Sequence, residues 1–185
     1  MKVFINPGHD RTYDSGAVNP NTGMREADVA AEIGERLKGY LEAIGIEIEM
    51  FQSDNLYYDS NYTDRTVPVC EAANNSGADI FVSIHCNAAN GVARGTETFV
   101  YSWGGAATTL ANCVQNQILN ALGTIDRGIK VRNDLIVLKR TNMPAILVET
   151  AFIDNDSDAE LLTNHRDDFA AAIARGITDF QNNRG

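Results

Sequence analysis

The sequence is short of cysteine and of basic residues, and each shortage excludes a class of protein. Its three cysteines, Cys70, Cys86 and Cys113, are widely spaced and form no CxxC pair. This pattern excludes a disulfide framework and a cysteine zinc knuckle, so we expect the thiols to pack as small buried side chains. Fifteen Lys and Arg against 25 Asp and Glu give a formal net charge of −10. That charge argues against nucleic acid and anionic membranes as partners, because basic residues supply much of the affinity for both.

Long hydrophobic runs are lacking as well. No segment approaches the ~20 apolar residues of a membrane-spanning helix. Residues 1–6 are too short and too polar at their ends to act as a signal peptide. We therefore expect a chain without a membrane span or a visible export signal: an isolated domain, a cytoplasmic protein, or a protein released by another route.

What the sequence does contain is an alternation of short apolar runs and helical patterns. Strands are expected at 2–6, 46–51, 80–84, 96–101, 135–138 and 145–148. Apolar residues recur at helical spacing around 29–44, 67–75, 110–122 and 162–180. A tyrosine-rich surface loop is expected at 52–62. The alternation predicts an α/β fold, with residues 1–185 as a single domain: a twisted, mostly parallel six-stranded sheet with helices on both faces.

Polar side chains follow three of the expected strands. His9 lies just past the first strand, His85 ends the third, and Glu149 follows the run at 145–148. Ligands of open α/β sheets bind beyond the carboxyl ends of the strands, so these side chains converge if their strands are parallel neighbours. Two histidines with nearby carboxylates suit a zinc ion that keeps one open position.

The spacing leaves the third zinc ligand undecided among Asp10, Asp14 and Glu26. Each residue also has an ordinary explanation. A histidine after a strand is commonly a solvated loop residue, Glu26 at a helix start would favour the helix dipole, and Glu149 could be a plain strand-end charge.

The order of six short sequence segments is more informative about function than the spacing of the individual polar residues. The segments are 6–9 (NPGH), 14–17 (DSGA), 25–28 (READ), 77–88 (GADIFVSIHCNA), 95–99 (GTETF) and 143–155 (MPAILVETAFIDN). Together they resemble the zinc-dependent N-acetylmuramoyl-L-alanine amidases of the amidase-3 family, across nearly the whole chain.

The resemblance implies a role for particular residues. His9, Glu26 and His85 would bind Zn²⁺, and Glu149 would be the catalytic carboxylate. The implied substrate is peptidoglycan at the bacterial cell wall. The implied reaction cleaves the amide bond between N-acetylmuramic acid and L-alanine of the stem peptide, with a zinc-activated water and a glutamate general base.

The sequence departs from the family pattern in three places. Residues 10–13 (DRTY) stand where glycines are usual and are one residue longer, Ala151 replaces a glycine, and Cys86 replaces a commoner small residue. No proposed ligand is lost, but the first departure leaves the shape of the loop near the metal open.

Other residues have a functional and an ordinary explanation. Glu97 is a candidate support for a zinc ligand or a plain strand residue. Trp103 is expected to pack at a strand end rather than stack on a sugar, and His165 to lie on the surface. Three basic residues are candidates to bind a stem-peptide carboxylate or are simply solvated: Arg127, Lys130 and Arg132.

Two other functions share these features: a zinc peptidase, which has the same metal chemistry, and a metal-binding or wall-binding module without turnover. The presence of Glu149 argues against the second. No wall-binding repeat is visible, and the net charge of −10 would be repelled by anionic wall polymers. We therefore expect targeting to depend on a separate wall-binding domain.

Overall fold

The computed structural model describes residues 1–57 and 67–183, and every structural statement below concerns these residues. Part of the predicted loop at 52–62, from residue 58 onward, therefore lies outside the described residues. Among the described helices, none combines the length and the apolar character that crossing a membrane requires.

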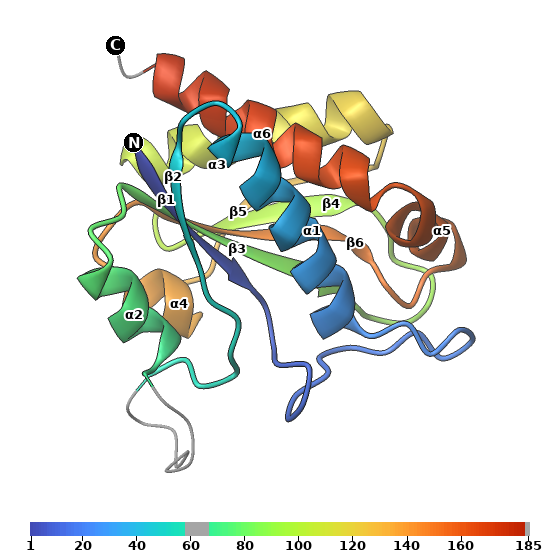
Figure 1. Cartoon of the computed structure of the whole chain (residues 1–185). Coiled ribbons are helices and arrows are strands. Elements are labelled where there is room, and N and C mark those ends of the chain that lie inside the picture. The colour runs from blue at the N-terminus through green and yellow to red at the C-terminus, as the bar shows by residue number, and fades with distance from the viewer. Residues whose placement is uncertain (58–66, 184–185) are drawn as a thin grey trace.

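Six strands form one twisted sheet in the order β2-β1-β3-β6-β4-β5 (Figure 1). The strands are β1 (Lys2–Pro7), β2 (Glu47–Met50), β3 (Ile80–Asn87), β4 (Thr96–Val100), β5 (Asp126–Val131) and β6 (Ala145–Phe152). Four of the five neighbouring pairs are parallel, and β4 is antiparallel to β6. The predicted α/β fold with a mostly parallel six-stranded sheet is confirmed.

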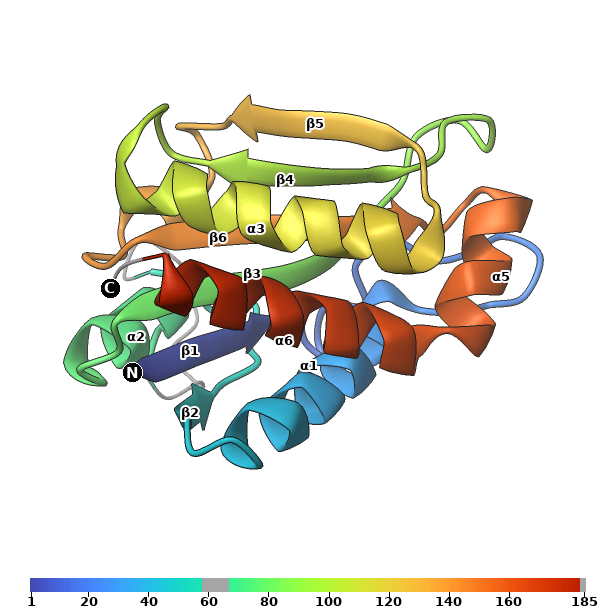
Figure 2. The same cartoon turned by 90° about the horizontal axis from the view of Figure 1, so that it is seen from above.

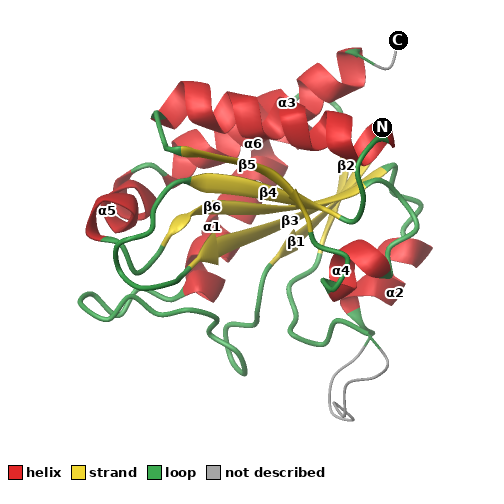
Figure 3. Cartoon of the chain, turned by 180° about the vertical axis from the view of Figure 1, so that it is seen from behind, coloured by secondary structure: helices red, strands yellow, loops and turns green. Residues whose placement is uncertain are grey.

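Helices cover both faces of the sheet, as predicted. One face carries α1 (Glu26–Glu42), α3 (Gly105–Leu122) and α6 (Arg166–Asn182), seen side by side in Figure 2. The other face carries the short helices α2 (Val69–Asn75) and α4 (Ile136–Lys139), which are seen together at the lower right of Figure 3. Helix α5 (Asp156–Asn164) follows β6 at the end of the sheet.

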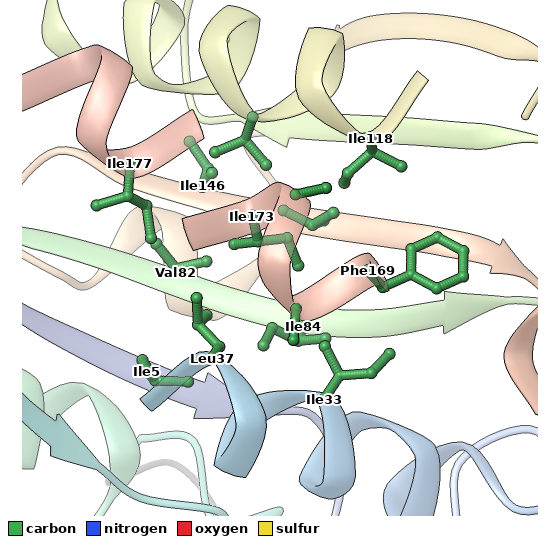
Figure 4. Packing of buried hydrophobic residues seen from close by; sticks show 14 of the residues in the cluster. Ile5, Ile33, Leu37, Val82, Ile84, Ile118, Ile146, Phe169, Ile173 and Ile177 are labelled. Carbon is green, nitrogen blue, oxygen red and sulfur yellow. The ribbon is translucent and has the colours of Figure 1, made fainter. Parts of the chain in front are cut away.

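Strand residues alternate between two hydrophobic clusters, one on each face, because successive side chains of a strand point to opposite sides. Ile146 and Val148 of β6 belong to the larger cluster, whereas Leu147 belongs to the smaller one. Figure 4 shows how Ile173 of α6 packs on the sheet within the larger cluster. By the same alternation, Glu149 lies on the face of the smaller cluster, which is the face of α2 and α4.

Two expectations about the second half of the chain are wrong. The run at 135–138 is not a strand, because Leu135 precedes the single-turn helix α4 and its Val137 and Leu138 fill the smaller cluster. The sixth strand is β5, a polar strand at the edge of the sheet. The closing helix is also two helices, α5 and α6, which meet at His165.

The cysteines lie much as expected. Cys70 and Cys86 are buried, Cys113 is partly buried, and all three are free thiols.

Candidate metal centre

The two histidines meet because their strands are parallel neighbours. Pro7 of β1 pairs with Ile84 of β3, so His9 and His85 leave the sheet at the same edge. Their rings lie edge to face with centroids 5.0 Å apart. Strand β6 lies on the other side of β3, and there His85 is in register with Glu149. The convergence expected from strand ends is therefore found.

The loop after His9 turns sharply back on itself. His9 has a φ of 64°, a left-handed conformation that is uncommon outside glycine. The carboxylate of Asp10 accepts hydrogen bonds from the backbone N–H groups of Thr12 and Tyr13, at 2.8 and 3.0 Å. The tight loop returns Asp14 to the histidine, and Asp14 Oδ2 lies 2.8 Å from His9 Nδ1. Residues 10–13, where the sequence departs from the family pattern, thus form a closed turn beside the site.

Glu26 lies between the two histidines. It is the first residue of α1 and is only 4% exposed. Its Oε2 lies 3.0 Å from His9 Nε2, and its Oε1 lies 2.9 Å from His85 Nδ1. The same two oxygens accept the backbone N–H groups of Ala17 at 2.9 Å and Cys86 at 3.0 Å. Glu26 is therefore the carboxylate that faces both histidines.

The other two candidate carboxylates have different places. Asp14 contacts the nitrogen of His9 that faces away from Glu26, and Asp10 bonds within its own loop. A histidine that binds a metal commonly donates its other N–H to a carboxylate, which fixes its tautomer and ring orientation. Asp14 suits this supporting role, which the sequence analysis missed.

Two glycines make room for the histidine rings. A Cβ on Gly8 would lie 2.2 Å from Cε1 of His85, and a Cβ on Gly16 would lie 2.5 Å from Cδ2 of His9. Both distances are too short for any side chain. The glycines of the NPGH and DSGA segments are thus explained by packing, which the sequence alone did not indicate.

The donor set fits zinc. Atoms of His9, Glu26 and His85 that can bind a metal all lie within 4.8 Å of one another. Imidazole nitrogen and carboxylate oxygen bind zinc at about 2.0–2.2 Å, which places tetrahedral ligands roughly 3.3 Å apart. The nitrogen-to-oxygen distances of 2.9 and 3.0 Å are close to that separation. These three residues can hold a zinc ion.

In the metal-free chain, the charged groups of the site shift one another's pKa values. Burial lowers the pKa of His9, but hydrogen bonds to Glu26 and Asp14 outweigh it and raise the pKa to about 9. Burial raises the pKa of Glu26, but hydrogen bonds from His85 and His9 outweigh it, so the pKa is well below its usual range. A metal that binds here must displace a proton from His9.

Glu149 is partly buried beside this group. Its Oε2 atom is buried, and no described residue gives it a hydrogen bond. The pKa of Glu149 is raised to about 7, mainly by burial. The nearby charges of Glu26 and Glu97 raise it further, whereas His85 and His9 lower it. A carboxyl group with a free oxygen and a pKa near neutrality is suited to accept a proton.

Glu97 lies directly opposite Glu149 on β4. Its Oε1 accepts Asn87 Nδ2 at 2.8 Å, and its Oε2 accepts Arg127 Nε at 2.9 Å and Lys130 Nζ. None of these three partners is a proposed metal ligand, and the two alternatives for Glu97, support of a zinc ligand or a plain strand residue, stay predictions.

A cleft of about 150 Å³ opens in front of the histidines. Beyond His9, His85 and Asp14, its wall is largely apolar: Leu56, Leu135, Ile136, Val137 and Leu147. A larger hollow of about 640 Å³ is lined by α1, α3 and α6, on the opposite face from Glu149. Proximity to the two histidines, rather than size, makes the first cleft the candidate functional one.

Two remaining predictions concern exposed residues. Trp103 is 63% exposed, so the expectation that it packs at a strand end is wrong. It follows β4, whose antiparallel course ends at the edge of the sheet opposite to His85 and Glu149. His165 is exposed, as predicted.

Comparisons with known proteins agree with one another. The family described as N-acetylmuramoyl-L-alanine amidase matches residues 3–179. The sporulation-specific N-acetylmuramoyl-L-alanine amidase of Bacillus subtilis (strain 168) is 36% identical over 179 residues, which are 95% of this chain and 65% of that protein. The N-acetylmuramoyl-L-alanine amidase LytC of the same organism is 36% identical over 183 residues, 96% of this chain and 35% of that protein. This chain thus spans 65% of the length of the first relative and 35% of the second.

A solved structure shows the same fold. The crystal structure of an N-acetylmuramoyl-L-alanine amidase from Clostridium difficile 630 matches with a TM-score of 0.83 and 31% sequence identity. The match covers 100% of this chain and 98% of that chain.

Proposed function

Because this chain belongs to the N-acetylmuramoyl-L-alanine amidase family, we propose that it hydrolyses the amide bond between N-acetylmuramic acid and L-alanine in peptidoglycan. The observation that carries the proposal is the buried carboxylate of Glu26 between His9 and His85, with Glu149 on the next strand. We propose that the first three residues bind zinc and that Glu149 is the general base. Bound zinc would supply a water nucleophile at neutral pH and polarise the amide carbonyl.

The chain's own residues then have separate tasks. Asp14 holds His9 with Nε2 turned toward the metal position, and the N–H groups of Ala17 and Cys86 hold Glu26. Glu149 would accept the proton of the attacking water on its carboxylate and pass it to the leaving amine. General acid–base catalysis of this kind contributes about 10²–10⁴-fold. Burial raises the pKa of Glu149 to about 7, and a cation held by His9, Glu26 and His85 would favour its ionised form.

The test is hydrolysis of purified peptidoglycan with and without a chelator, with the products identified by mass spectrometry. We expect chelator-sensitive release of peptides that begin with L-alanine, while the glycan strands stay intact. Shortened peptides would instead indicate a zinc peptidase. Zinc binding without any product, from several wall types, would indicate a binding module and contradict the proposed reaction.

The role of Glu149 is tested in the same assay. Glu149→Gln should bind zinc with unchanged stoichiometry and lose about 10²–10⁴-fold in rate, because only proton transfer is removed. Glu160→Gln, which alters an exposed glutamate of α5, is the matched control. A Glu149→Gln enzyme with the wild-type rate would rule out this base.

We also propose that the chain acts at the bacterial cell wall and that a separate wall-binding domain directs it there. Two observations support this: the chain spans 65% of the length of the sporulation-specific amidase and 35% of that of LytC, and its net charge is −10.

A further inference from the structure

Two cations are fixed on one buried carboxylate beside the proposed base. Glu97 is 5% exposed and binds Arg127 Nε at 2.9 Å and Lys130 Nζ through the same oxygen. Its other oxygen is held by Asn87. The guanidinium of Arg127 also lies over the ring of Phe152, 4.8 Å from its centroid. Both cations are therefore held in place by the fold.

The cluster on Glu97 has an unbalanced positive charge and unused hydrogen-bond donors. One carboxylate against two cations leaves a net charge of +1, in a chain whose net charge is −10. The side chains of Arg127 and Lys130 remain 33% and 44% exposed. An ammonium group has three N–H donors, and Lys130 uses one of them on Glu97 among the described residues. The cluster can therefore bind a further anion from solvent.

The strand order places the cluster next to the proposed base, on the side of β6 away from β3 and β1. The proposed ligands belong to β1, β3 and α1, the base to β6, and the cation cluster to β4 and β5, the next strands in the same direction. Since Glu149 must deliver its proton to the leaving nitrogen, the amine product lies over β6. A peptide that runs from this nitrogen away from the proposed metal ligands passes over β4 and β5.

The spacing of the strands gives the position of the bound group. Neighbouring strands are about 4.8 Å apart, so the cations lie roughly 5–10 Å beyond the base. An extended peptide advances about 3.3 Å per residue, so this span corresponds to about two or three residues.

We propose that Arg127 and Lys130 bind a carboxylate of the leaving peptide, about two or three residues from the scissile nitrogen, and that Glu97 is their positioning residue. The inference rests on the proposed function and adds a specificity site to it. Carboxylate recognition by a guanidinium and an ammonium group uses charge-assisted hydrogen bonds, which are stronger than neutral ones.

Arg132 provides a matched control. It lies just after β5 and, like Lys130, its side chain is 44% exposed. Its Nε and Nη2 atoms bind the two oxygens of Asp134 at 2.9 and 2.8 Å. Its charge is thus paired outside the cluster on Glu97.

The experiment measures kcat and KM on synthetic muramoyl peptides with zinc-loaded enzyme. One substrate has a free carboxylate on the second residue and one on the third, and each has a carboxamide counterpart. We expect the wild type to prefer one acid substrate over its carboxamide. Lys130→Met and Arg127→Gln should raise KM for that acid about 10- to 100-fold and change KM for the carboxamide little. Arg132→Gln should change neither.

Glu97→Asp separates a positioning role from a merely structural one. The shorter side chain withdraws the carboxylate from the cations, so we expect a higher KM for the acid substrate with kcat little changed. Equal losses on acid and carboxamide in Lys130→Met, or no loss on either, would overturn the carboxylate site. A wild type that cleaves none of the four substrates would instead overturn the proposed amidase function.

Discussion

Three glutamates around the site have three different surroundings, and these determine what each can do. Glu26 is held by two histidines and two backbone N–H groups, which keep it ionised. Glu97 is held by two cations and an amide. Burial raises its pKa, but the hydrogen bonds from the two cations lower it by more. Glu149 has a buried oxygen without a partner, and its pKa is raised to about 7. Environment, not residue type, distinguishes the proposed metal ligand, the proposed positioning residue and the proposed base.

The raised pKa of Glu149 has a measurable effect on stability. In the metal-free folded chain it is about 7, against an ordinary value of 4.5. Between these values the folded chain keeps a proton that the unfolded chain has released, so stability falls as pH rises through this window. We expect Glu149→Gln to raise the free energy of unfolding at pH 8 by up to about 3 kcal/mol, and not to raise it near pH 4.

Urea unfolding in the presence of a chelator measures this difference. Glu160→Gln, at the surface of α5, controls for the loss of one negative charge. An equal effect of Glu149→Gln at both pH values would show that burial does not hold the proton on this carboxyl.

At this scale the sequence predicted the site only in part. Strand ends were enough to bring His9, His85 and Glu149 together, because parallel neighbours share an edge. The choice of Glu26 came from the family resemblance, since spacing cannot show which carboxylate faces both rings. The place of Asp14 depends on a tight turn with a left-handed His9, and no pattern in the sequence indicates that turn.

At the scale of elements, the first half of the chain was easier to predict than the second. Apolar, β-branched runs identified β1 and β3 because both are buried on two faces. Strand β5 was missed because it is an edge strand with charged residues, and Gly128, with a φ of 77°, interrupts its pattern. Helix α4 was predicted as a strand because an apolar run of four residues has no detectable period.

The contact between α3 and α6 depends on a glycine. A Cβ on Gly176 of α6 would lie 2.5 Å from Cα and 2.8 Å from N of Val114 in α3. Because backbone atoms cannot move aside without a cost in free energy, Gly176→Ala should lower the free energy of unfolding by about 1–3 kcal/mol. Gly39→Ala, in α1 with nothing within 4 Å, should instead raise it by roughly 0.5–1 kcal/mol. Chemical denaturation of both variants checks this, and changes of the same sign would contradict it.

At the scale of the whole molecule, the net charge of −10 bears on targeting. Anionic wall polymers repel a chain of this charge, and the repulsion weakens as salt screens it. We expect intact walls to retain this chain weakly at low salt, and the retained fraction not to fall at higher salt. Fusion of a wall-binding domain to the chain should make retention strong. Sedimentation of the chain with purified walls measures this. Tight binding by the chain alone would refute the need for a separate domain.

The sheet order also divides the proposed chemistry along the chain. All three proposed metal ligands lie between residues 9 and 85, on or beside β1, β3 and α1, whereas Glu149 belongs to β6. A ribosome that has completed β3 has already made every proposed ligand but has made neither the proposed base nor the cations of β5. The proposed hydrolytic site is therefore completed only late in translation, once the strands of the second half of the sheet have been made.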